Sequence, residues 1–115
     1  MIALEFPEDH FTSRHKYEVE REDHLRYMMY SKYTPEEFAR IGELIICGHT
    51  DLGSWTLLFR QPVAGFQIKD YSSGEWKWVK AQDATITVNA SDALNLLTAY
   101  YVKSTIHREI GRAHV

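Results

Sequence analysis

The chain of 115 residues is long enough for one domain at most, and its 44% hydrophobic content supplies a core. Its net charge of −3 gives no basic field for nucleic acid, and the single Cys47 excludes an internal disulfide. No apolar run approaches the roughly 20 residues that cross a membrane. We therefore expect a cytoplasmic protein with no nucleic-acid partner and no membrane partner.

The first part of the chain divides into a polar lead and an aromatic run. Residues 1–24 are charged and aromatic, and we interpret them as the end of an N-terminal region followed by a connector. Residues 25–33 are rich in aromatic side chains and predict a strand. A helix is then predicted from Pro35, because Thr34 is a favoured N-cap and Glu37 completes a capping box with it.

A short apolar run over residues 44–51 ends in His49-Thr50-Asp51. Side chains two residues apart on a strand share a face, so His49 and Asp51 are predicted to lie side by side and to bind one cation together. A second imidazole completes the two histidines and one carboxylate that suit non-haem Fe(II) oxygenases. His107, in a strand-like run over residues 101–108, offers that imidazole. The alternative for a lone His-x-Asp pair is a solvated pair without a metal.

The remaining sequence alternates short strands with turns. The expected strands are Trp55–Phe59, Gly65–Lys69, Glu75–Lys80 and Ala84–Asn89, with a hairpin turn at Ser72–Gly74 and a helix from Asp92 to Leu97 capped by Ser91. Short strands at close spacing with only brief helices predict an all-β sandwich or barrel. We expect the tryptophans to pack in its core, and Cys47 to be buried and reduced beside His49.

The order and spacing of these motifs resemble the 2-oxoglutarate and Fe(II)-dependent dioxygenases, particularly the isopenicillin N synthase-like branch and its fungal members. The motifs are His49–Asp51, Trp55–Phe59, Gly65–Ile68, Gly74–Trp76, Val88-Asn89 with Asp92 and Leu94, and Ser104–Arg108. The resemblance covers about residues 25–108. It implies a double-stranded β-helix, which is a jelly-roll barrel with the iron at its mouth.

The resemblance also implies a site. His49, Asp51 and His107 correspond to the Fe(II) ligands of the family, and Tyr30 corresponds to a tyrosine that contacts the 2-oxoglutarate carboxylate. Met28 stands where the family has an asparagine. The implied activity is hydroxylation or oxidation of a small organic substrate by O2, coupled to decarboxylation of 2-oxoglutarate to succinate, by a protein that is a monomer at full length.

The chain departs from the family after Arg108. The family continues to an Arg-x-Ser motif whose arginine grips the far carboxylate of 2-oxoglutarate, whereas Arg112 is followed here by Ala113 and His114. Residues 109–115 read as the translation of a sequencing-adapter oligonucleotide, and we predict that they are a non-native tail. The chain is thus interpreted as a truncated fragment with a partial dioxygenase domain, and an incomplete barrel, at residues 25–108.

Two other functions stay open at this point. One is an isopenicillin N synthase-like oxidase of the same fold that does not use 2-oxoglutarate. The other is a catalytically inactive metal-binding β-barrel, in which Cys47 would add a fourth ligand and close a structural zinc site.

Overall fold

The computed structural model describes residues 5–42, 44–60 and 65–110, which fall into two units, residues 1–31 and residues 32–115. The first unit holds one short 3₁₀ helix, η2 (Thr12–Arg14), and a stack of the Phe6 and His10 rings with centroids 4.3 Å apart. The domain boundaries expected from the sequence stay predictions. Of the expected tail, residues 111–115 lie outside the described residues.

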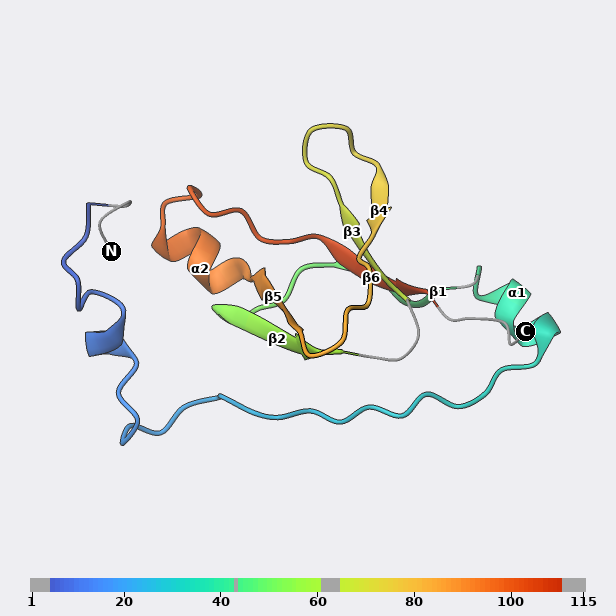
Figure 1. The fold of residues 1–115 in the computed structure, drawn as a ribbon, viewed down its shortest axis with the longest axis horizontal. Helices are drawn as coiled ribbons and strands as arrows, with labels where there is room; N and C mark the ends of the chain where they lie inside the picture. The colour runs from blue at the N-terminus through green and yellow to red at the C-terminus, as the bar shows by residue number, and fades with distance from the viewer. Residues whose placement is uncertain (1–4, 43, 61–64, 111–115) are drawn as a thin grey trace. The chain divides into compact units, whose positions relative to one another are not determined.

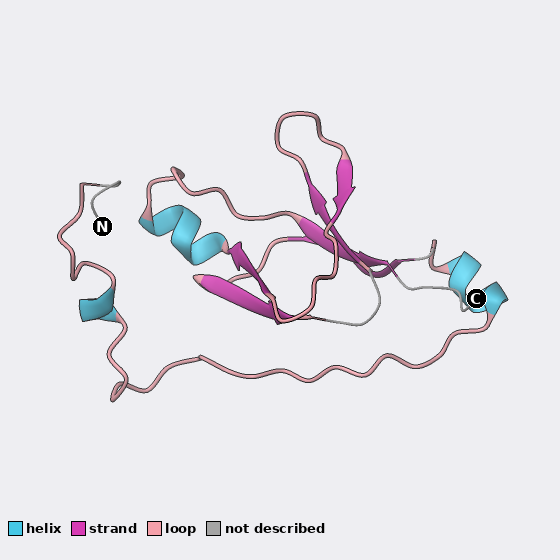
Figure 2. Ribbon diagram, viewed as in Figure 1, coloured by secondary structure: helices cyan, strands magenta, loops and turns pink. Residues whose placement is uncertain are grey.

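The second unit contains two antiparallel sheets and two short helices (Figures 1 and 2). The larger sheet has the strand order β1-β6-β3-β4, and the smaller one pairs β2 with β5. The elements are α1 (Pro35–Arg40), β1 (Leu44–His49), β2 (Trp55–Phe59), β3 (Phe66–Lys69), β4 (Trp76–Trp78), β5 (Ile86–Ala90), α2 (Asp92–Leu97) and β6 (His107–Ile110). The predicted all-β class with short helices is confirmed.

Helix α1 begins as its sequence predicts. The Glu37 amide donates to the Thr34 hydroxyl at 3.2 Å, and the Thr34 amide donates to the Glu37 carboxylate at 2.9 Å. Pro35 occupies the start of the helix, where no intrahelical donor is needed. These contacts satisfy two of the amides that every helix start leaves without a partner.

The strand predicted over residues 25–33 is wrong, since the described residues there form no strand. A strand is stabilised when a neighbour takes up its backbone donors and acceptors, and this run has no ladder partner among the described residues. Its aromatic and apolar side chains are instead exposed, Tyr27 to 90% and Met29 to 98%. The aromatic residues favour a strand locally, but hydrogen bonding to a neighbouring strand decides whether a strand forms.

The smaller sheet has one exposed apolar face. Leu57 lies opposite Val88 and Phe59 opposite Ile86, and all four side chains are about half exposed. Trp55 and Trp78 are also more than half exposed, so the expectation that the tryptophans fill a core is wrong for these two. Among the described residues, the buried apolar side chains are Phe38 and Leu94, and the buried polar ones are Gln67, Asn89, Ser91, Thr98, Ser104 and His107.

The β3–β4 hairpin is closed by one carboxylate. Asp70 Oδ1 accepts hydrogen bonds from the Ser72 amide at 2.8 Å and the Ser73 amide at 3.0 Å, while Asp70 Oδ2 is paired with the Lys77 ammonium. Gly74 has φ +71°, a conformation that glycine adopts without strain. The Lys77 contact and the two amides hold the pKa of Asp70 well below its usual value.

We predict that the hairpin loses stability in acid through Asp70. Because the pKa is lower in the folded state, the contribution is fully present above the unfolded pKa of about 4 and is lost as the pH falls below it. The difference in free energy of unfolding between the wild-type chain and Asp70→Asn should therefore shrink from pH 6 to pH 3 in urea titrations. A difference that stays constant over this range contradicts the assignment.

Candidate metal centre

Three side chains converge at one end of the larger sheet, two from neighbouring strands and one from the loop that follows the first of them. His49 ends β1, His107 begins β6, and the two residues are direct partners in the antiparallel ladder. Asp51 follows two residues after His49, just past the end of its strand. Segments that are far apart in the sequence thus bring two imidazoles and one carboxylate together.

The ladder that carries the two histidines is irregular. Its register shifts between Leu44 and Ile46 and again between Ile46 and His49, and β1 has one residue more than β6 in each interval. Such bulges bend a strand and re-aim its side chains, and they are common beside active sites. These bulges bring His49 into register with His107, which is the last residue pair of the β1–β6 ladder.

The donor atoms are close enough to share one ion. Asp51 Oδ1 lies 3.5 Å from His49 Nε2 and 3.6 Å from His107 Nε2, and the three donors all lie within 4.8 Å of one another. Two donors about 2.1 Å from a shared ion, at right angles, are about 3 Å apart, so each of the two Asp51–histidine distances would need to shorten by only about half an ångström. The predicted convergence of His49, Asp51 and His107 is confirmed.

Both histidines are held in the same tautomer by their own backbone. His49 Nδ1 donates to the carbonyl of Cys47 and His107 Nδ1 donates to the carbonyl of Thr105, each at 2.9 Å. A carbonyl only accepts, so Nδ1 carries the hydrogen, and in the neutral imidazole Nε2 then presents its lone pair to the site. This arrangement is the usual way in which a protein orients metal-binding imidazoles.

The two oxygens of Asp51 have different partners. Oδ1 faces the histidines, whereas Oδ2 accepts a hydrogen bond from Asn89 Nδ2 at 3.1 Å. Burial raises the pKa of Asp51, but hydrogen bonds from Thr56 and Asn89 and the neighbouring His107 and His49 more than offset it and lower the pKa. The carboxylate is therefore ionised at neutral pH and has one oxygen directed at the site.

One backbone contact and one side-chain contact from the start of α2 fix the loop that carries Asp51. The Asp92 amide donates to the Asp51 carbonyl at 2.8 Å, and the Thr50 hydroxyl donates to Asp92 Oδ2 at 2.9 Å. The sequence singled out Asn89 and Asp92 only as parts of a motif and assigned them no contact. Their role comes from β5 and α2 lying against the loop, which spacing along the chain does not reveal.

The site is closed on one side and open on the other. The side chain of His107 is 8% exposed, that of Asp51 24% and that of His49 39%. The Phe66 ring lies against His107, with centroids 5.2 Å apart. The site is therefore most exposed at His49, and the Phe66 ring packs against the buried His107.

Two further sequence predictions have different outcomes. Cys47 is exposed, so its predicted burial is wrong: among the described strands, β1 is at the edge of its sheet and pairs with β6 alone. Cys47 is also not among the three converging residues, so it does not close a four-ligand zinc site with them. Tyr30 belongs to the other unit, and its predicted contact with 2-oxoglutarate stays a prediction.

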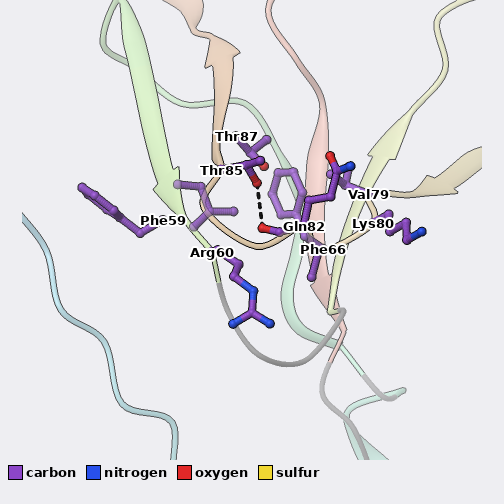
Figure 3. A pocket seen from close by; sticks show the side chains of 10 residues that line it. Phe59, Arg60, Phe66, Val79, Lys80, Gln82, Thr85 and Thr87 are labelled. Carbon is purple, nitrogen blue, oxygen red and sulfur yellow. Dashed lines mark hydrogen bonds between the residues drawn. The ribbon is translucent and has the colours of Figure 1, made fainter.

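A small cavity lies between the smaller sheet, the start of β3 and the segment that joins β4 to β5 (Figure 3). Its volume is about 40 Å³, which is room for a few water molecules. Phe66 lines this cavity and also packs on His107, so it separates the cavity from the converging side chains. The cavity is too small to hold a five-carbon dicarboxylate.

Comparison with known proteins assigns the chain to a family. Residues 22–112 match the 2OG-Fe(II) oxygenase superfamily. The 2-oxoglutarate-dependent dioxygenase citB of Monascus ruber is 32% identical over 88 residues, which are 76% of this chain and 27% of that protein. Clavatol oxidase claD of Penicillium crustosum is 32% identical over 84 residues, 73% of this chain and 25% of that protein. The chain belongs to the 2OG-Fe(II) oxygenase superfamily.

Solved structures agree with this assignment. The crystal structure of a full-length Neurospora crassa protein in complex with alpha-KG superposes with a TM-score of 0.64 at 32% identity, over 72% of this chain and 27% of that one. The predicted double-stranded β-helix is confirmed by such relatives. The chain spans about a quarter of the length of these proteins. Among the described residues, no helix is long and apolar enough to cross a membrane.

We predict that Asn89 sets the metal affinity through Asp51. Replacing Asn89 with Ala removes the donor to Oδ2 and frees the carboxylate to rotate, which should weaken Co²⁺ binding by about 10- to 100-fold. Titration of the visible Co²⁺ absorption measures this. Asn95→Ala is the matched control, since Asn95 Nδ2 bonds to Ser104 and not to Asp51. Equal affinities of the two variants contradict the role of Asn89.

Proposed function

We propose that this chain carries the Fe(II) centre of a 2-oxoglutarate-dependent dioxygenase, with His49, Asp51 and His107 as the ligands. The observation that carries the proposal is their convergence: one donor atom of each residue lies within 4.8 Å of the others, and Asp51 Oδ1 is 3.5 Å and 3.6 Å from the two Nε2 atoms. Two imidazoles and a carboxylate on one face of an ion leave the opposite positions open, which is the donor set of non-haem Fe(II) oxygenases. When bound, Fe(II) supplies the redox chemistry that couples O2 and 2-oxoglutarate to oxidation of a small organic substrate.

The residues of the chain contribute binding and orientation. The backbone carbonyls of Cys47 and Thr105 fix the imidazoles, and Asn89 holds Asp51 so that a single oxygen faces the ion. Phe66 packs against the ring of His107, whose side chain is 8% exposed. None of the three ligands acts as a proton donor or acceptor in this scheme, so the chemistry belongs to the metal and the co-substrate.

The wider assignments are also proposals. Tyr30 would contact a carboxylate of 2-oxoglutarate through its phenol. The protein would act on a small organic substrate in the cytoplasm, as a monomer and without a nucleic-acid or membrane partner. The net charge of −3 supports the absence of a nucleic-acid partner. The single cysteine supports a reducing compartment.

We predict that the chain binds one Fe(II) and loses it when a ligand is removed. Asp51→Ala or His107→Ala should weaken anaerobic Fe(II) binding by more than about 100-fold, because each deletes a direct donor. Isothermal titration with Fe(II) measures the affinity and the stoichiometry. His24→Ala, which removes an exposed histidine of the first unit, should leave both unchanged. Fe(II) binding that survives in Asp51→Ala contradicts the proposal.

We also predict that the 115-residue chain binds 2-oxoglutarate weakly. The chain contains no Arg-x-Ser motif, so it lacks a charge-assisted fork to the distal carboxylate. Hydrogen bonds to charged groups contribute about 1.5–3 kcal/mol each. The affinity should therefore lie about one to two orders of magnitude below that of the same chain extended through an Arg-x-Ser strand. Titration of the Co²⁺-loaded proteins with 2-oxoglutarate, together with succinate release from the Fe(II)-loaded proteins, measures this. Equal affinity and turnover contradict the prediction.

A further inference from the structure

We infer that Trp76 is a positioning residue for the metal centre, which it reaches from the opposite face of the larger sheet. The inference rests on the proposed metal function. Trp76 lies on β4, at the far edge of the sheet from β1, yet its ring extends to both strands that carry histidines. It does so through Arg108 on β6 and Gly48 on β1.

Both contacts of Trp76 are close. The guanidinium carbon of Arg108 lies 4.2 Å from the centroid of the Trp76 ring, which is a cation–π contact. A β-carbon added to Gly48 would lie 3.0 Å from Trp76 Cη2 and 3.2 Å from Cζ2. Gly48 therefore leaves space that the indole fills, and even a methyl group there would press on the ring.

Each contacted residue adjoins a proposed ligand. Gly48 precedes His49 and Arg108 follows His107, and successive residues of a strand point to opposite faces. The indole thus lies behind the two histidines. Arg108 is fixed in turn, because its Nε donates to Gln67 Oε1 at 2.8 Å and Gln67 is only 5% exposed.

The strands need such support because their ladder is irregular. The register between β1 and β6 shifts twice before His49, and β1 has no other neighbour in its sheet among the described strands. Backbone hydrogen bonds alone therefore leave β1 freer to slide or tilt than a central strand. Trp76 touches β1 and β6 at the level of the two imidazoles and so sets the separation of their Nε2 atoms.

The first test compares two tryptophans of one strand. Trp76→Leu should weaken Co²⁺ binding about 10-fold and change the intensity of the Co²⁺ absorption, because the ligand geometry relaxes. Trp78→Leu makes the same change two residues away, at a side chain that is 57% exposed, and should keep the wild-type affinity and spectrum. Trp76→Phe retains a ring over Arg108 and should restore most of the affinity. All titrations are made well below the unfolding temperature, which is measured for each variant.

The second test decides the matter if Trp76→Leu does not fold. Gly48→Ala should also weaken Co²⁺ binding, by less than Trp76→Leu does, because the added methyl group pushes the indole aside by a few tenths of an ångström. Gly53→Ala is the matched control, since a β-carbon there meets nothing within 4 Å. Co²⁺ affinities and spectra of Trp76→Leu or Gly48→Ala that equal those of their controls overturn the positioning role alone. A wild-type chain that binds no Co²⁺ or Fe(II) overturns the metal function, and the positioning role with it.

Discussion

The carboxylate of Asp51 joins the two sheets of the second unit. Its Oδ1 faces histidines of the larger sheet, and its Oδ2 accepts from Asn89 on β5 of the smaller sheet. The adjoining backbone is tied to the start of α2 through the Asp92 amide. A carboxylate in this position has little rotational freedom, because each of its oxygens already has a set direction. The geometry of the site is thus a consequence of how the two sheets meet.

The histidines are fixed by a different means, which requires no tertiary partner. Each Nδ1 donates to a carbonyl two residues earlier in its own segment, Cys47 for His49 and Thr105 for His107. The local backbone thus sets the tautomer of each imidazole, and the strand pairing sets the distance between the two rings. Both are needed for the three donors to share one centre.

The features that the sequence predicted correctly are those encoded locally. The capping box of Thr34 and Glu37, the β3–β4 turn and the alternating strand β2 each depend on residues a few positions apart. The convergence of His49, Asp51 and His107 was also predicted, since the donor set itself limits how the strands can be arranged. The need for two imidazoles and one carboxylate at one ion predicted a contact between residues far apart in the sequence. Hydrophobic periodicity predicts no such contact.

The incorrect predictions concern features that depend on neighbours. Residues 25–33 have strand-like composition but no ladder partner among the described residues, and Cys47 is exposed on β1, which is at the edge of its sheet among the described strands. The register shifts in β1 and the hydrogen bond from Asn89 to Asp51 had no signal in the spacing of residues. In each case the sequence gives a residue's preference, whereas packing decides its environment.

The composition of the interior links metal binding to the stability of the fold. Among the described residues, buried apolar side chains are few, and Asn89, Gln67 and His107 are buried polar groups that desolvate on folding. Such groups stabilise little even when they are hydrogen-bonded, so the folded state gains less from burial than an apolar core would provide. A ligand that binds only the folded state adds about 2.7 kcal/mol when its concentration is 100 times its Kd. An ion bound by His49, Asp51 and His107 would close the segment 49–107 into a loop. It would thereby stabilise the contact between the two sheets. Metal binding and folding are therefore expected to be one coupled equilibrium in this unit, with Asp51 as the residue common to both.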